Sequence, residues 1–176
     1  MNYRFTKIVF KSLNTVVYLI SYVNHRFYMV LYYQLLKFAG VKFRGKPRYI
    51  GKDVKFDNYR KISLGDRIVI SNECILLTHD YSITTALISI KEIPTKDIAL
   101  ERTIEIGDNV FIGKRSIIMP NTTIGNNVII GAGSVIRGKI PDYSVVIGNP
   151  CEIVGDIREQ ALKWKKYLNT GCVRID

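Results

Sequence analysis

Ile106-Gly-Asp-Asn-Val-Phe opens a run of six-residue units that continues as Ile112-Gly-Lys-Arg-Ser-Ile, Ile118-Met-Pro-Asn-Thr-Thr, Ile124-Gly-Asn-Asn-Val-Ile, Ile130-Gly-Ala-Gly-Ser-Val and Ile136. An isoleucine begins each of the six successive units, and glycine follows four of those isoleucines. Self-similarity at a fixed short period is typical of a solenoid, in which each unit buries its apolar face only against its neighbours.

The repeat predicts a triangular prism in which each unit is a short strand plus a bend and three units make one coil. The leading isoleucines point inward, so Ile106 stacks under Ile124, and the same step joins Ile112 to Ile130 and Ile118 to Ile136. Small residues at the fifth place are expected near the corners: Ser116, Thr122 and Ser134. Gly, Asn and Asp at the bends are expected to adopt left-handed backbone angles.

The repeat also occurs earlier in the chain. Units beginning at Leu64, Ile70 and Leu76 keep its phase, whereas those beginning at Ile50 and Phe56 are offset by two residues. This offset predicts a bulge or small insertion near Ile62 and Ser63. Between His79 and Thr103 the repeat stops, and a loop of this length is expected to be functional and to leave the prism as an arm.

Three segments follow from this pattern. A basic, aromatic helical segment covers residues 1–45, the prism covers 46–155, and a closing helix and tail cover 156–176. Asp156 is placed to cap an amphipathic helix over Ile157–Leu168, which is predicted to cover the open end of the prism. The N-terminal helices could cover the other end.

Composition excludes several classes of protein. The chain has 176 residues, of which 47% are hydrophobic and 23% charged, which disfavours a disordered or polytopic membrane protein. Its three cysteines, Cys74, Cys151 and Cys172, form no C-x-x-C pair, so neither a disulfide-stapled secreted fold nor a zinc ribbon is expected. A reducing, cytoplasmic compartment fits this usage.

Charge is concentrated at the N-terminus. Net charge is +11, and residues 1–52 hold ten basic residues and no acidic one, so the other 124 carry 16 basic and 15 acidic residues. The apolar stretches Ser12–Val23 and Phe27–Leu36 are shorter than the ~20 residues of a spanning helix. They predict helices that either pack on the prism or lie in a membrane interface at the inner face of the membrane.

The tail of the repeat carries a family resemblance. Ile130-Gly-Ala-Gly-Ser-Val-Ile-Arg-Gly-Lys-Ile-Pro-Asp-Tyr-Ser-Val-Val-Ile-Gly-Asn-Pro-Cys resembles the hexapeptide-repeat acyltransferases, most closely the maltose and galactoside O-acetyltransferase type and its relatives in surface-polysaccharide biosynthesis. The resemblance covers about Arg48 to Val154. It implies a mainly β fold, a left-handed parallel β-helix with N-terminal helices, a protruding loop near 80–102 and a C-terminal helix. It also implies a homotrimer that binds acetyl-CoA in grooves between its prisms.

The resemblance assigns the general base to His79, because family members carry a catalytic histidine at the start of the long loop. Histidine suits proton removal because its pKa lies near working pH. Asp80 could orient the imidazole or simply cap the loop, and Tyr81 could line the acceptor pocket. Asn58 is a candidate for acceptor binding. His25 is expected to be a packing or surface residue.

The resemblance also gives coenzyme A positions through the ungapped tail. Phe111 matches a frequent tryptophan near the cofactor groove. The other positions are Lys114, Ala132, Arg137 and Gly138. The family's usual Thr-Lys pair is Arg137-Gly138 here, so Lys139 is expected to replace the missing lysine charge. A solvated outer face is the alternative for Lys114 and Arg137.

These residues favour an acetyl-CoA-dependent O-acetyltransferase acting on a sugar or glycan by direct transfer. Amino-sugar N-acetylation and streptogramin-type drug acetylation remain open, as does a non-catalytic scaffold. A zinc carbonic anhydrase of this fold would need three histidines, and the chain has two, so no metal site is expected. No nucleic-acid partner is expected either, because the basic segment is apolar.

Overall fold

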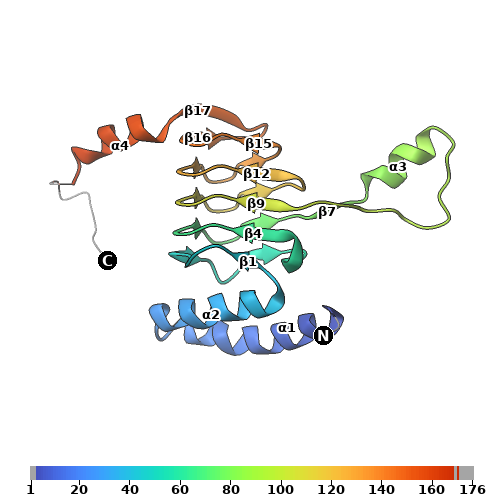
Figure 1. Ribbon diagram of the computed structural model, residues 1–176, viewed down its shortest axis with the longest axis horizontal. Helices are drawn as coiled ribbons and strands as arrows, with labels where there is room; N and C mark the ends of the chain where they lie inside the picture. The colour runs from blue at the N-terminus through green and yellow to red at the C-terminus, as the bar shows by residue number, and fades with distance from the viewer. Residues whose placement is uncertain (1–2, 169, 171–176) are drawn as a thin grey trace.

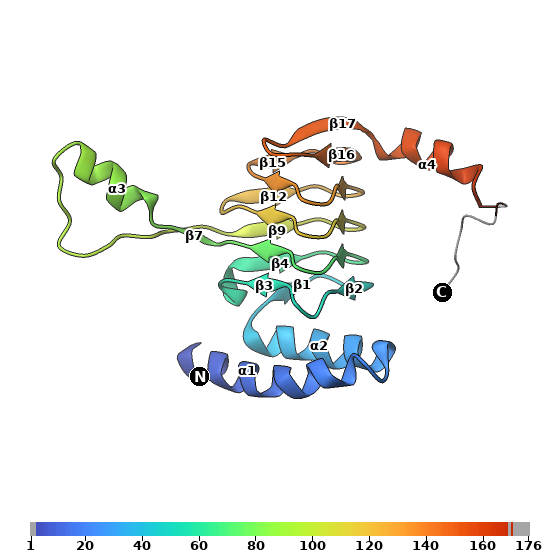
Figure 2. The ribbon, with the colours of Figure 1, turned by 180° about the vertical axis from the view of Figure 1, so that it is seen from behind.

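The computed structural model describes residues 3–168 and 170, which build a three-sided column of short parallel strands (Figures 1 and 2). The first face holds β1 (Lys42–Phe43), β4 (Ile62–Leu64), β9 (Ile104–Ile106), β12 (Thr122–Ile124) and β15 (Lys139–Ile140). The second holds β2 (Tyr49–Ile50), β5 (Val69–Ile70), β10 (Phe111–Ile112), β13 (Ile129–Ile130) and β16 (Ser144–Ile147). The third holds β3 (Lys55–Phe56), β6 (Ile75–Leu76), β11 (Ile117–Ile118) and β14 (Val135–Ile136).

The chain visits the three faces in the same order in every coil, and the strand register confirms the predicted stacking. Ile106 pairs with Ile124 on the first face. Ile112 pairs with Ile130 on the second, and Ile118 with Ile136 on the third. All six side chains are at most 2% exposed, so the isoleucine columns form the core.

The small residues at the fifth place of the unit lie buried at the corners, as predicted. The hydroxyl of Ser116 donates to the carbonyl of Gly113 at 2.8 Å, three residues earlier. Thr122 and Ser134 make the same bond to Met119 and Gly131, both at 2.7 Å. A larger side chain there would have no space, and an alanine would leave the carbonyl without this partner.

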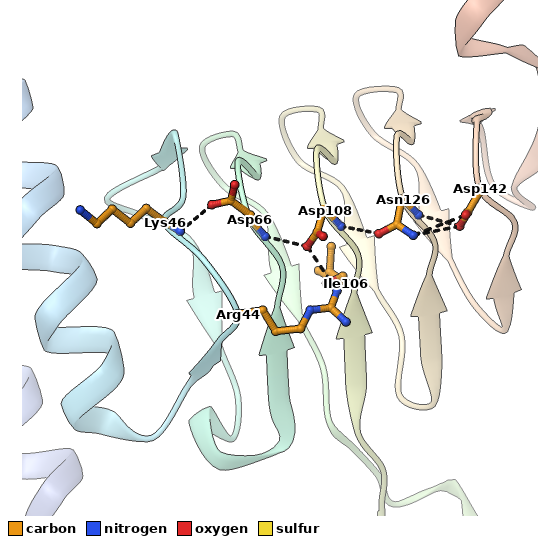
Figure 3. Close-up of polar contacts among 7 residues, drawn as sticks. All are labelled: Arg44, Lys46, Asp66, Ile106, Asp108, Asn126 and Asp142. Atoms are coloured by element: carbon orange, nitrogen blue, oxygen red, sulfur yellow. Dashed lines mark hydrogen bonds and ion pairs between the residues drawn. The ribbon is translucent and has the colours of Figure 1, made fainter.

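A polar ladder lines the corner between the first and second faces (Figure 3). Its side chains are Asp66, Asp108, Asn126 and Asp142. In each, a side-chain oxygen accepts a backbone N–H from the coil below at 2.8–2.9 Å. The ladder explains why Asp or Asn recurs at this place in the repeat, since it satisfies N–H groups that the bend leaves unpaired.

The ladder also explains the glycine that precedes it, and one expectation is corrected here. A Cβ on Gly65 would lie 2.3 Å from the Asp108 carboxylate, and one on Gly107 would lie 2.4 Å from a carbonyl. These glycines are therefore required by close stacking, and their φ angles are not left-handed. The left-handed residues come two places later, such as Asn109 at φ 53° and Asn127 at φ 55°.

Replacing Asp108 with alanine is expected to lower the free energy of unfolding by about 1 kcal/mol, because the Asp66 N–H loses its charged acceptor. Urea unfolding monitored by circular dichroism measures this change. Asp97→Ala, in the arm, is the matched control and should leave the midpoint unchanged. Equal midpoints for the two variants would contradict a stabilising role for the ladder.

The two-residue offset of the early units comes from a short turn. Ile50 pairs with Ile70 and Phe56 with Leu76, twenty residues apart instead of eighteen. The extra residues form the 3-10 turn η1 (Tyr59–Lys61), so the insertion precedes the position predicted for it. Ile62 and Ser63 are regular residues of β4, because Ile62 must stay inside the column, where it is 1% exposed.

The predicted arm leaves the column after β6 (Figures 1 and 2). Its two sides pair as antiparallel strands, β7 (His79–Asp80) and β8 (Leu100–Glu101), with His79 opposite Glu101. Between them the chain forms the short helix α3 (Ser82–Ser89). The strand pair ties the base of the arm to the corner where His79 lies.

Two helices lie across the N-terminal end of the column. They are α1 (Tyr3–Ile20) and α2 (His25–Ala39), and α2 is the nearer of the two to the column (Figures 1 and 2). The hydroxyl of buried Tyr28 donates to the carbonyl of Ile50 at 3.2 Å, which fixes α2 to the first coil. No helix among the described residues combines the length and hydropathy needed to cross a bilayer.

The C-terminal end differs from the prediction. Asp156 caps α4 (Ile157–Lys165) as expected, accepting the Arg158 N–H at 2.8 Å. The helix has no buried residue, however, and extends sideways from the column, so the prediction that it covers the open end is wrong (Figure 1). The cause is β17 (Glu152–Asp156), which pairs antiparallel with β16 and leads the chain outward. Residues 169 and 171–176, with Cys172, lie outside the described residues.

Candidate active site

His79 lies at the corner between the third and first faces, at the base of the arm. Strand β6 ends at Leu76, and Thr78 turns inward with 1% exposure, which anchors the backbone beside the histidine. The His79 side chain is 39% exposed. It is therefore held by a buried neighbour yet open to a ligand. The Tyr81 ring stands edge-on to it, with centroids 5.3 Å apart.

Asp57 lies beneath His79 and contacts its ring. A carboxylate oxygen of Asp57 meets the Nδ1 of His79 and also accepts the N–H and the hydroxyl of Thr78, at 3.0 and 2.6 Å. The contact follows from the register, since Phe56 pairs with Leu76 and so places Asp57 one coil below the turn to His79.

The electrostatics of this pair favour an ionised carboxylate. Partial burial alone would raise the pKa of Asp57, but hydrogen bonds from Thr78 and His79 outweigh it and hold that pKa below its ordinary value. An anion on Nδ1 favours the tautomer with its proton there, leaving the Nε2 lone pair free to accept a proton. The arrangement suits a general base oriented by a carboxylate.

Asp57 was not among the residues singled out from the sequence, although a signal for it existed. The unit that begins at Phe56 is offset from the later units, and stacking it under Leu76 places Asp57 near His79. Asp80, which was considered for orienting the ring, instead accepts the Ser82 N–H at 2.8 Å. That N–H and the Ser82 hydroxyl hold the pKa of Asp80 below its ordinary value, so the Asp80 carboxylate is engaged by the first residue of the arm helix.

An open hollow of about 280 Å³ lies beside this corner. Asp80 and Arg137 both line it, together with Arg102 from the end of the arm. Met119, Pro120 and Leu100 supply an apolar wall. Two guanidinium groups beside an apolar wall suit a ligand with both anionic and apolar parts. The structure thus brings Asp80 and Arg137 together near His79, and Gly138 and Lys139 follow Arg137 directly.

The other predicted coenzyme A residues lie elsewhere on the chain. Lys114 and Ala132 lie at the corner between the second and third faces, where the Lys114 ammonium pairs with Glu73 at 2.9 Å. Phe111 is 44% exposed on the second face, in a separate groove of about 300 Å³ that Trp164 also lines. Within one chain these three residues are not contiguous with His79.

The remaining candidates have local roles. Asn58 follows Asp57, and its side chain accepts the Arg60 N–H at 3.2 Å, capping η1. Cys74 is fully buried and donates its thiol to the carbonyl of Gly113. Among the described residues, no group of three or more His, Cys, Asp or Glu side chains is placed to hold a metal ion.

Comparison with known proteins shows what the chain is similar to. The model of the bacterial transferase hexapeptide (six repeats) matches residues 103–138, across the isoleucine stacks. A Mycobacterium tuberculosis protein named as a probable acetyltransferase is 28% identical over 69% of the chain. The Escherichia coli protein WbbJ, named as a lipopolysaccharide biosynthesis O-acetyl transferase, is 28% identical over 72% of the chain. The chain thus shares its repeat with the hexapeptide-repeat acyltransferase superfamily, to which these relatives are also similar.

Solved structures of this superfamily share the fold. A maltose O-acetyltransferase from Clostridium difficile is 26% identical, with a TM-score of 0.54 over 70% of this chain and 73% of that one. A Vibrio cholerae hexapeptide-repeat acetyltransferase complexed with acetyl-CoA is 19% identical, with a TM-score of 0.55 over 70% of this chain and 75% of that one. The chain spans 38% and 66% of the lengths of the two curated relatives.

Proposed function

We propose that this protein is an acetyl-CoA-dependent O-acetyltransferase acting on a sugar or glycan in surface-polysaccharide biosynthesis. The observation that carries the proposal is the Asp57–His79 pair at the base of the arm, beside an open hollow. We infer that the acyl donor is acetyl-CoA, because a solved acetyltransferase of this fold is complexed with it. WbbJ, which aligns with 72% of the chain, supports the glycan acceptor by its name.

The chemistry is a direct transfer. His79 accepts the proton of the acceptor hydroxyl through Nε2 while the oxygen attacks the thioester carbonyl. The carbon–sulfur bond then breaks, and the proton passes from the imidazolium to the departing sulfur. The products are the acetyl ester and free coenzyme A thiol. Asp57 remains ionised and stabilises the imidazolium in between.

The proposed binding residues divide between donor and acceptor. Acceptor contacts are assigned to Asp80 and Tyr81, which follow His79 in the chain, and to Asn58, which follows Asp57. Donor contacts are assigned to Phe111, Lys114, Ala132, Arg137, Gly138 and Lys139. Because the donor residues lie on separate corners of one column, we include in the proposal a homotrimer whose grooves bring them together across neighbouring copies. The left-handed winding of the coils belongs to the same proposal.

The test is acceptor-dependent release of thiol from acetyl-CoA by the full chain. The acceptor panel contains sugars, nucleotide sugars, amino sugars and lipid-linked glycan fragments. Release with hydroxyl acceptors supports the proposal, and release with amino sugars alone would replace it with N-acetylation. If no acceptor gives release and titration shows no acetyl-CoA binding, the transferase proposal fails and a scaffold is the better account.

Replacing Asp57 with asparagine is expected to lower kcat by about 10- to 100-fold, because the imidazolium loses its anion and the favoured tautomer is no longer enforced. KM for acetyl-CoA should stay within about two-fold, since Asp57 lies beneath the histidine and acts through it. Asp66→Asn is the matched control, as the Asp66 carboxylate also accepts a backbone N–H from the coil below but lies at the corner between the first and second faces, away from His79. Equal losses in both variants would mean that Asp57 has no special orienting role.

A further inference from the structure

Helix α1 is apolar on two sides. One side packs inward through Phe10 and Val17, and the Phe10 ring lies 4.7 Å from that of Tyr59. The other side is an exposed row that we call the outer stripe, made up of Phe5, Ile8, Val16, Leu19 and, just past the helix, Val23. Their exposure runs from 56% to 89%. A helix that only packs on its own domain carries polar residues on the side away from the core.

The helix is also the outermost layer of its end of the molecule. Both views show α1 lying flat across the column axis, with α2 between it and the first coil (Figures 1 and 2). The outer stripe follows a spacing of three, eight, three and four residues, which keeps it on one side of the helix. That side is roughly opposite the one holding Phe10 and Val17, so the stripe faces away from the column.

The positive charge of the N-terminal segment indicates which kind of surface would cover the outer stripe. Residues 1–52 contain ten lysines and arginines and no acidic residue. At the end of α1 the Lys52 ammonium lies 4.5 Å above the Tyr18 ring and 3.8 Å from the centre of the Tyr22 ring. Tyr22 is 66% exposed, and an exposed ring beside a lysine suits the headgroup layer of a membrane, where the ring is half buried and the cation meets phosphate.

We propose that the outer stripe of α1 binds the surface of an anionic lipid bilayer. A second copy of the chain would bring two basic segments together, whereas anionic headgroups complement them. The helix would lie in the interface with its apolar side in the acyl boundary and its basic residues at the headgroups. This inference stands on the helix surface alone and does not depend on acetyl transfer.

The placement has a consequence for the site. His79 follows a strand of the second coil, one strand spacing, about 4.8 Å, above the first coil. The first coil rests on α2, so the candidate active site lies in the half of the column nearer α1 and α2, whereas the helix α4 lies at the far end (Figure 1). An acceptor held in the bilayer by a lipid anchor would thus approach the half of the column that carries His79.

The experiment is flotation of the full chain with vesicles of phosphatidylcholine alone or with about 30% phosphatidylglycerol. We expect binding to the anionic vesicles only, weakened when salt rises from about 0.1 to about 0.5 M. Val16→Glu combined with Leu19→Glu should lower the bound fraction by about ten-fold. Leu162→Glu, at an apolar position of α4 that is 73% exposed against 58% for Val16 and 62% for Leu19, is the control and should bind like the parent.

Two further measurements distinguish membrane binding from contact between copies of the chain. A Phe5→Trp variant in a Trp164→Phe background places a single tryptophan on the outer stripe, and its emission should shift to the blue when anionic vesicles are added. Molecular mass without lipid is measured in parallel for the double variant, and circular dichroism checks its fold. Unchanged vesicle binding with a changed mass would overturn the proposal and make the stripe a contact between copies of the chain. Absence of vesicle binding by the parent would overturn it as well, whatever the thiol assay shows.

Discussion

Replacing His79 with alanine is expected to lower kcat for acetyl transfer by about 10²- to 10⁴-fold, the range typical of a lost general base. The His79 side chain lies at the base of the arm, has the Asp57 carboxylate on Nδ1 and is 39% exposed. The acetyl-CoA dissociation constant should stay nearly unchanged, because Nε2 is assigned to the acceptor hydroxyl and not to the donor. Thiol release and a titration of acetyl-CoA binding measure the two quantities.

His25→Ala is the control for this variant. His25 stacks near the rings of Tyr28 and Tyr49, with centroids 5.6 and 5.2 Å away, and lies on α2 rather than at the site. Its replacement should leave kcat within about two-fold. A His79→Ala protein with near-parental kcat would show that the proton leaves by another route. If both variants lose activity together with their fold, His79→Gln provides a substitution closer in size.

The isoleucine stacks were predictable because every third unit of the repeat meets the same face. Counting eighteen residues from Ile106 to Ile124 fixes their pairing without knowledge of any other contact. The arm was predictable for a related reason, since a repeat that stops and resumes must leave the column between the two points. Both predictions use the period alone, and the period is set by burial of the leading side chain.

The Asp57 carboxylate that orients His79 was harder to predict, because its position depends on a strand register that cannot be read from the six-residue period. Two extra residues in η1 move Asp57 out of phase with the later units, and only the pairing of Phe56 with Leu76 restores the alignment. Asp80 is the candidate that the sequence offers for orienting the imidazole, because it is adjacent to His79 in the chain. In a solenoid the closer neighbour is the residue one coil below, since strands stack about 4.8 Å apart.

The direction of α4 could not be predicted for a different physical reason. An amphipathic pattern shows that one side of a helix is apolar but not which surface it meets. The apolar residues Leu162 and Trp164 are 73% and 52% exposed, so much of the apolar side of α4 stays uncovered. The pairing of β17 with β16 sets where α4 begins and therefore where it points.

The core of the column should respond strongly to a single truncation. Replacing Ile112 with alanine is expected to lower the free energy of unfolding by about 2–5 kcal/mol, because the side chain is fully buried and the stacked coils cannot collapse around the cavity. Ile112 lies in register between Ile70 and Ile130, so its loss weakens contacts to the coils on both sides. Urea unfolding of the full chain measures the change.

Ile129→Ala is the matched control, with the same side chain one residue before Ile130 and facing outward on the same face. This substitution should lower the free energy of unfolding by less than about 1 kcal/mol, because a partly exposed side chain buries less apolar surface on folding than a fully buried one. Equal costs at the two positions would mean that the inward stacks do not dominate stability. A larger loss at Ile112 would show that burial of the inward side chain, repeated at every sixth residue, is what stabilises the column.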